Sequence, residues 1–455
     1  MRGVTAICAH MPGDYVERFT GVGVASELVC EACATSGAPA AEASAEVFAR
    51  VRDHNRVRFE GSPQVIELAS ELTFAHEDIA LDCPELADLH AVGSDDRNRW
   101  LGVTADGVLF ELDLDRGEVR EVMRVAIAAP LELHVSADGR YAAVVQARGV
   151  HGVIVELAAG RVIMQLERED YYAVQCRFPF AFVTRRDRQL AIYSPQWNRL
   201  AAFDVQTNEA LTARPPIAHT DRHYLDYFHS GLHVSPGGQM IADNGWHWHP
   251  FGRIATWNLE RWLTDNVWES EDGRTRRETA LRDEWDVPLC WLDDEHFAVW
   301  GYGDGLVDAA AEIYDARTGK LERWFAGPER SDFVFDRVLF VLGESTTVWD
   351  VERGGRLLSD RSTSRYHPSA KCFATPPKSG RITISRLRGL DAKAPWATDA
   401  IRTLAGSIDE LQVGLGVLGD ALDDAGCTDE QMLAHCRQPG PHGARCWVLD
   451  RLGVG

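Results

Sequence analysis

The sequence lacks the long apolar runs that a membrane protein needs. No stretch of its 455 residues reaches transmembrane length, and residues 1–20 carry His10, Asp14, Glu17 and Arg18 where a secretion signal needs a continuous apolar core. Its ten cysteines are few for this length, and most stand alone in apolar surroundings. Isolated thiols suit a reducing compartment, so we expect a cytoplasmic protein without disulfides.

Positive charge is also scarce. The chain has 47 Lys and Arg against 69 Asp and Glu, which gives a net charge of −22. Such a chain repels phosphate backbones and anionic membranes, and its densest basic run, Arg185, Arg186 and Arg188, is interrupted by Asp187. We therefore expect no nucleic-acid or membrane partner, and the acidity favours a basic one.

Familiar catalytic motifs are missing. The sequence contains no Gly-x-Ser-x-Gly elbow, no phosphate-binding glycine loop with lysine, no dinucleotide-binding glycine pattern and no His-Glu-x-x-His pair. This absence favours a binding protein over an enzyme.

One short phrase recurs seven times between residues 110 and 388, and it consists of an apolar residue, a polar and usually acidic one, and usually an aliphatic one. The copies are Leu112-Asp113-Leu114, Val155-Glu156-Leu157, Phe203-Asp204-Val205, Trp257-Asn258-Leu259, Tyr314-Asp315-Ala316, Trp349-Asp350-Val351 and the degenerate Ser385-Arg386-Leu387. Their spacing of 35 to 57 residues is typical of four-stranded propeller blades. The sequence thus predicts a mainly β protein, a seven-bladed β-propeller.

Two blades share a further pattern, in which an alternating apolar strand runs into a turn. The turns contain Asp138-Gly139 and Gly237-Gly238, and a second apolar strand follows each of them. Glycine supplies the positive φ that such hairpin turns need. Both stretches therefore predict β-hairpins.

The last blade, residues 366–387, has sequence for only three strands. An open ring would expose strand edges, so a strand from the N-terminal side should complete this blade. We expect it within residues 57–72, at either 57–59 or 64–68.

The phrases resemble those of the WD-repeat and related bacterial propeller families. Trp349-Asp350 and Tyr314-Asp315, the latter followed by Thr318-Gly319-Lys320, match that pattern best, whereas the glycine-histidine pair that opens WD blades is mostly missing. The resemblance covers about 330 residues and implies the propeller fold without naming a partner.

Three regions are predicted: an N-terminal segment and linker over 1–56, the propeller over 57–390, and a small helical module over 391–455. In the last region, apolar residues at helical spacing indicate an amphipathic helix, namely Ile408, Leu411, Leu415, Leu418 and Leu422. The tail also resembles a short helical segment that recurs at the C-terminal ends of uncharacterised bacterial proteins, and that resemblance implies no activity.

The N-terminal segment carries four candidate zinc ligands: Cys8, His10, Cys30 and Cys33. Two ligands from each end of a loop can enclose a tetrahedral ion and stabilise a knuckle too small for its own core. The Cys-x-x-Cys half is a common zinc half-site, whereas the Cys-x-His half is unusual. Structural zinc, no metal and a redox dithiol are the three alternatives.

Tryptophans crowd the fourth and fifth blades. We predict that Trp246, Trp248, Trp262 and Trp268 anchor a protein or peptide on one propeller face, because tryptophan is enriched at binding hot spots; the alternative is packing between blades. The mixed-charge insertion 263–284 follows, and it is either a solvated excursion or a rim that holds the partner.

His247 and His249 share one face if they lie on a strand, as two metal ligands would. This pattern supports a second hypothesis, a metal-assisted hydrolase or lyase with a histidine-bound ion on blade 4. The same residues also fit an aromatic hairpin packed against its neighbours. Our leading prediction is a non-enzymatic interaction scaffold.

Overall fold

The computed structural model describes the main chain of residues 4–7, 15–19, 26–30 and 41–42, and residues 64–93, 97–186, 188–247, 251–282, 284–302, 307–378, 380–390, 398–408, 415–427, 430–437, 448–449 and 452. The chain forms two compact units. One comprises residues 1–70 and 74–386, and the other comprises residues 71–73 and 387–455.

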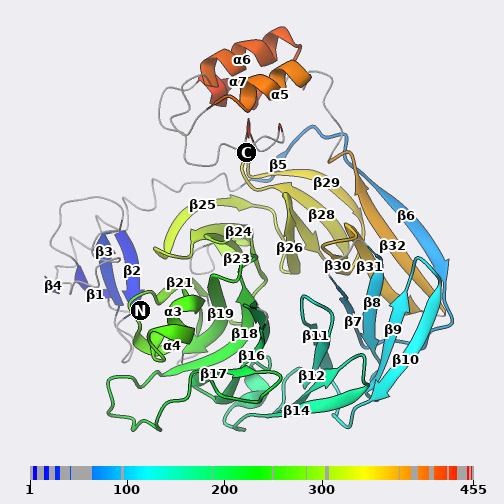
Figure 1. Cartoon of the computed structure of the whole chain (residues 1–455). Coiled ribbons are helices and arrows are strands. Elements are labelled where there is room, and N and C mark those ends of the chain that lie inside the picture. The colour runs from blue at the N-terminus through cyan, green and yellow to red at the C-terminus, as the bar shows by residue number, and fades with distance from the viewer. Residues whose placement is uncertain are drawn as a thin grey trace. The chain divides into compact units, whose positions relative to one another are not determined.

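Seven antiparallel sheets, counted within these residues, are the blades of a propeller (Figure 1). Blade 1 comprises β7 (Asp88–Ala91), β8 (Arg99–Val103), β9 (Val108–Asp113) and β10 (Glu118–Arg124). Blade 2 comprises β11 (Leu131–Val135), β12 (Tyr141–Gln146), β13 (His151–Glu156) and β14 (Arg161–Glu167). Blade 3 comprises β15 (Phe180–Arg185), β16 (Arg188–Gln196) and β17 (Arg199–Asp204). Blades 4 and 5 comprise β18 (Tyr227–Val234), β19 (Met240–His247), β20 (Phe251–Asn258) and β21 (Arg277–Arg282); and β22 (Leu289–Trp291), β23 (His296–Tyr302), β24 (Val307–Asp315) and β25 (Lys320–Ala326). Blades 6 and 7 comprise β26 (Asp332–Asp336), β27 (Val338–Leu342), β28 (Ser345–Asp350) and β29 (Gly355–Arg361); and β30 (Arg365–His367), β31 (Cys372–Lys378) and β32 (Arg381–Arg388).

The first strand of each blade lines the centre, and these inner strands neighbour one another around the ring, with β30 of blade 7 against β7 of blade 1. The predicted seven-bladed propeller is therefore confirmed. Each repeated phrase lies in the third strand of its blade, at or near its end. Both predicted hairpin turns are also confirmed, with positive φ at Gly139 (67°) and Gly238 (70°).

The ring is closed as predicted, but by a different segment. The fourth strand of blade 7 is β6 (Thr73–Ala80), which lies just beyond the predicted window of residues 57–72. The candidate at residues 64–68 instead supplies β5 (Ile66–Glu67), a fifth strand parallel to β29 of blade 6. The prediction of the segment was wrong because an outermost strand is largely exposed, and the polar run His76, Glu77 and Asp78 hides its alternation.

Hydrophobic cores lie between adjacent blades. Between blades 1 and 2, for example, Leu101 and Val103 pack with Val144 and Val153. A similar cluster joins the last blade to the first through Trp100 and Ile382. The flat faces of the sheets are therefore buried, which leaves the loops at the rims free to vary.

The insertion 263–284 is not a solvated excursion, and the alternative of a rim that holds the partner stays a prediction. It runs from the end of α3 (Leu259–Thr264) through α4 (Glu269–Asp272) into the outer strand β21. Glu269 and Glu271 are buried, and Glu271 forms an ion pair with buried Arg214. These two glutamates are therefore part of the packed interior of blade 4.

The N-terminal segment contains a four-stranded sheet of order β2-β3-β1-β4, formed by β1 (Val4–Ile7), β2 (Tyr15–Phe19), β3 (Ser26–Cys30) and β4 (Ala41–Glu42). Cys30 is the last residue of β3, and its side chain lies outside the described residues, as do Cys8, His10 and Cys33. The zinc prediction is therefore not tested by this structure.

The second unit is helical and comprises α5 (Asp399–Ala405), α6 (Leu415–Asp424) and α7 (Glu430–Arg437). Leu415, Leu418 and Leu422 bury one face of α6, as their spacing predicted, together with Cys427 and Cys436. No helix in the described ranges is long and apolar enough to cross a membrane.

Candidate functional site

Every inner strand begins on the same side of the ring, which we call the front face. Because neighbouring strands in a blade are antiparallel, this face also carries the connections between blades and the loops between second and third strands. Tyr171 and Tyr172, on one such connection, are the only aromatic residues among the most exposed large hydrophobic side chains of the part of the chain that the structure describes. They mark the front face of blades 2 to 5 as the candidate site.

The two tyrosines lie on the connection from β14 to β15, which is held rigidly. Tyr172 has a φ of 52°, a conformation that residues other than glycine seldom adopt, and it precedes a short 3-10 helix, η1 (Ala173–Gln175). The Arg168 guanidinium donates hydrogen bonds to four carbonyl oxygens, those of Gly149 (2.6 Å), Ala173 (2.7 Å), Cys176 (3.2 Å) and Arg177 (3.2 Å). A loop braced in this way presents its side chains in one arrangement.

Beneath this loop runs a stack of four rings, which we call the aromatic column: Trp197, Phe228, Trp246 and Trp285. The ring of Phe228 lies 4.4 Å from that of Trp197 and 4.0 Å from that of Trp246, which stacks in turn on Trp285 at 4.9 Å. Each such pair contributes about 0.5–1.5 kcal/mol beyond its buried area. Trp285 also donates a hydrogen bond from Nε1 to the carbonyl of Gln175, so the column holds the loop.

Three side chains of the loop remain open to solvent, and we call them the exposed patch: Tyr171 and Tyr172, which contact the column, and Val174. Tyr171 stacks over Phe228 at 5.8 Å, and the ring of Tyr172 meets Phe228 at 6.0 Å. Nevertheless, they expose 45%, 42% and 66% of their surface, respectively. Apolar surface kept in water on a rigid loop is typical of an interaction site.

A polar layer fixes the inner end of the same loop. The side chain of Asp286 is buried, and it accepts hydrogen bonds from the Ser230 hydroxyl and, at 3.2 Å, from the backbone N–H of Arg177. The Arg148 guanidinium pairs with the same carboxylate at 3.1 Å. Burial raises the pKa of Asp286, against the opposing effects of Ser230 and the two arginines.

Ser230 and its neighbour His229 lie at an irregularity in β18, where the pairing with β19 shifts between Phe228 and Gly231. Bulges of this kind redirect side chains and are common beside functional sites. His229 is buried and pairs through Nδ1 with the Asp243 carboxylate, and no described residue hydrogen-bonds its Nε2. The imidazole is therefore held in one orientation.

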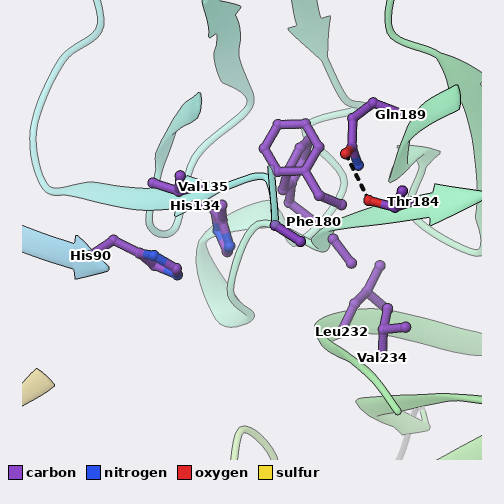
Figure 2. A pocket seen from close by; sticks show the side chains of 11 residues that line it. His90, His134, Val135, Phe180, Thr184, Gln189, Leu232 and Val234 are labelled. Carbon is purple, nitrogen blue, oxygen red and sulfur yellow. Dashed lines mark hydrogen bonds between the residues drawn. The ribbon is translucent and has the colours of Figure 1, made fainter. Parts of the chain in front are cut away.

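A cavity of about 280 Å³ lies in the central channel (Figure 2). His90 and His134 point into it, and Phe180, Leu232 and Val234 supply apolar surface. Burial, aided by the charges of Arg177 and Arg365 against that of Asp88, lowers the pKa of His134 to about 4. Burial likewise lowers the pKa of His90, so both imidazoles are neutral at pH 7.

The tryptophans singled out by sequence have different positions. Trp246 belongs to the aromatic column with 3% of its surface exposed, and Trp262 is fully buried with its ring against Trp257. Trp268 is half-buried and stacks on His223 at 4.2 Å between ring centres. Trp248 lies outside the described residues. Trp246 therefore supports the exposed patch from below, and Trp262 packs in the core.

His247, the candidate metal ligand, uses both ring nitrogens within the protein. Nδ1 lies 2.8 Å from the carbonyl oxygen of Asp226, and Nε2 lies 3.0 Å from the carboxylate of Glu278. Both partners only accept hydrogen bonds, so a metal ion could bind this ring only by displacing one of them. His249 lies outside the described residues, and among those described no group of three or more His, Cys, Asp or Glu is arranged to hold a metal ion.

The sequence did not reveal the residues that matter most here. Tyr171, Tyr172 and Arg177 lie in a connection whose mixed composition resembles any loop, and Trp197 stands alone in its segment. The available signal was the doublet of tyrosines between charged residues, but exposure is not encoded in local composition. The column forms only when four separate segments meet.

No protein-family model matches the chain, and no curated protein matches it. A chain in the crystal structure of the mitotic checkpoint complex is similar in fold, with 12% sequence identity and a TM-score of 0.46. The match covers 70% of this chain and 92% of that one. At that level the likeness carries no functional argument, and the function has to be inferred from the site.

Proposed function

We propose that this protein is a non-enzymatic interaction scaffold that binds a protein or peptide partner on the front face of its propeller. The exposed patch of Tyr171, Tyr172 and Val174 on the aromatic column is the observation that carries the proposal. Rigid aromatic side chains lose little conformational entropy on binding, so they are effective anchors. The net charge of −22 favours a partner that is basic overall.

The preformed loop strengthens this proposal. Arg168, Trp285 and Asp286 hold the connection at three points, so the patch needs no ordering when a partner arrives. Tyr171 and Tyr172 also carry hydroxyl groups beside apolar rings. This combination suits a surface that is exposed to water whenever no partner is bound. A free cytoplasmic scaffold with reduced thiols is consistent with the unpaired state of Cys83, Cys176, Cys290 and Cys372.

The double variant Tyr171→Ser/Tyr172→Ser tests the proposal. Partners captured from cytoplasmic extract by the wild-type protein should be lost, and a purified partner should bind about thirtyfold more weakly, because truncating central aromatic anchors costs about 2 kcal/mol or more. Titration calorimetry measures the affinity. The unfolding temperature should fall only modestly, since each side chain already exposes more than two fifths of its surface in the folded protein.

Val162→Ser is the matched control, because Val162 is also exposed, at 38%, but lies on the outer strand β14. It should leave binding unchanged. Equal retention of partners by the double variant and the wild type would refute the proposed site.

We also propose structural zinc in the N-terminal segment, held by Cys8, His10, Cys30 and Cys33. Elemental analysis of the purified protein should then find one equivalent of zinc, lost in Cys30→Ser because three ligands hold the ion poorly. His247→Ala should retain it. Protein without metal, or with metal unaffected by Cys30→Ser, would dismiss this site.

The metal-assisted hydrolase or lyase remains the alternative function. It requires an ion on blade 4 at His247 and His249, and the two hydrogen bonds of His247 count against that role. If the His247→Ala variant alone lost a stoichiometric metal, the enzyme hypothesis would be favoured over the scaffold hypothesis.

A further inference from the structure

The Arg177 guanidinium is an exposed cation on the loop that carries the exposed patch, and the acidic charges that act on it are those of Asp286 and Glu132. No residue in the described ranges hydrogen-bonds it or lies within ion-pair distance. Its neighbours differ: Arg148 pairs with Asp286 at 3.1 Å, and Arg168 is occupied by backbone carbonyls. The chain has many more acidic than basic residues, so an arginine that forms no ion pair is unexpected.

The position of Arg177 is nevertheless fixed. Its backbone N–H donates to Ser230 Oγ at 3.0 Å and to Asp286 at 3.2 Å, and its carbonyl accepts a hydrogen bond from Arg168 at 3.2 Å. Asp286 accepts hydrogen bonds from Ser230, from this N–H and from Arg148, and it forms no ion pair with the guanidinium of Arg177. The side chain therefore starts from a rigid backbone and ends in solvent.

The guanidinium lies toward the mouth of the central channel. Its charge acts on Glu132 and His134 of β11 and on His233 of β18, two of the inner strands, and His134 lines the cavity in the central channel. The same loop carries the exposed patch three to six residues upstream. A ligand on the patch that extends toward the channel thus passes Arg177.

We infer that the partner is recognised through a linear segment that places an acidic side chain on Arg177 and a large hydrophobic side chain on Tyr171, Tyr172 and Val174. This inference rests on the proposed function. A guanidinium group binds a carboxylate with two parallel hydrogen bonds. This geometry orients the ligand, which the hydrophobic contact alone would not do. Since extended chain spans about 3.4 Å per residue, the acidic residue should lie within about five residues of the hydrophobic one.

A locally acidic segment is compatible with a basic partner. Charges further apart than about 8–10 Å are screened at physiological salt, so the net charge of −22 guides encounter, whereas the contact at Arg177 depends on the nearest group. Glu169 and Asp170 precede the tyrosines on the same loop, and both are exposed. The loop is therefore acidic before the patch and basic after it.

Selection from a phage-displayed library of random twelve-residue peptides on the full-length protein tests this inference. Wild type should enrich peptides with Asp or Glu within five residues of an aromatic or large aliphatic residue. A synthetic peptide from that selection should bind Arg177→Glu about tenfold or more weakly, and raised salt should weaken its binding to wild type. Arg116→Glu, in the turn between β9 and β10 on the opposite face, is the control and should bind normally.

The outcomes separate the two claims. Peptides that need Tyr171 and Tyr172 but show no acidic preference and bind Arg177→Glu normally would overturn this inference and leave the proposed function standing. Peptides that bind Tyr171→Ser/Tyr172→Ser as well as wild type, or no enrichment at all, would overturn both. Enrichment of basic residues by Arg177→Glu in place of acidic ones would support the pairing directly.

Discussion

A chain that begins at residue 81 is expected to lose the cooperative unfolding transition of the propeller, whereas a chain that begins at residue 64 should keep it. The two differ by β5 and by β6, which completes blade 7 from the opposite end of the propeller sequence. Removing β6 exposes the edge of β32 and releases the covalent tie between the last and first blades. We expect a loss of more than about 4 kcal/mol, much of the total stability of a typical domain.

Specific contacts account for that loss. The His76 imidazole bonds the Ser385 hydroxyl at 2.8 Å and lies 3.2 Å from the Asp360 carboxylate. Phe74 packs edge-on against Phe373 at 5.9 Å, and Ile79 joins the core between blades 7 and 1. These residues connect β6 with both blade 6 and blade 7.

Chemical denaturation followed by tryptophan fluorescence measures the effect. The full-length variant Phe74→Ser/Ile79→Ser should lose about 2 kcal/mol, since it weakens the same strand without removing it. A chain lacking residues 1–80 that unfolds with the same midpoint and slope as the chain starting at residue 64 would show that the ring does not depend on this strand.

Glu278→Gln is expected to destabilise the protein by about 3–5 kcal/mol, because it leaves buried positive charge without its counter-ion. Glu278 pairs with the Arg276 guanidinium and, at 3.0 Å, with the His247 ring. The side chains of Arg276, His247 and Glu278 expose 8%, 4% and 1% of their surface. Water therefore cannot replace the lost carboxylate.

The matched control is Glu352→Gln, which breaks the pair with Arg323, where both side chains are more than a third exposed. It should cost about 0–1 kcal/mol. Urea unfolding at pH 7 compares the two variants. A penalty for Glu278→Gln as small as that for Glu352→Gln would contradict the role of the buried network.

The pH dependence gives a second readout. Burial alone would raise the pKa of Glu278, but the charge of Arg276 and the interactions with His247 hold it well below the ordinary value of 4.5. Because the pKa in the folded state is lowered, the stabilisation is complete above about pH 4.5 and is lost as the pH falls toward the folded pKa. The difference between wild type and Glu278→Gln should thus narrow below about pH 4.5.

The positions of the tryptophans differ from those that composition alone predicted. Two of the tryptophans that crowd blades 4 and 5, Trp246 and Trp285, belong to the aromatic column under the proposed site. Yet the side chains that reach solvent are Tyr171, Tyr172 and Val174, from the connection between blades 2 and 3. A large ring is as useful beneath a surface as on it, and sequence cannot separate the two.

The charged insertion makes the same point. Charged residues are usually solvated, but Glu269 and Glu271 are buried and pair with arginines from other parts of the chain: Glu269 with half-buried Arg261, and Glu271 with buried Arg214. The desolvation free energy of a buried carboxylate is offset only when a cation from another segment lies at ion-pair distance. That meeting is a property of the fold.

The sequence alone determined the seven-bladed architecture, the hairpin turns at Gly139 and Gly238, and the need for a strand from the N-terminal side. These features follow from local periodicity, backbone conformation and the count of strands, which are written residue by residue. The tertiary structure decided which strand closes the ring, that the aromatic column lies under the tyrosines, and that the Arg177 guanidinium makes no ion pair among the described residues. Burial and pairing depend on which distant segments come together, and no single stretch of chain contains that information.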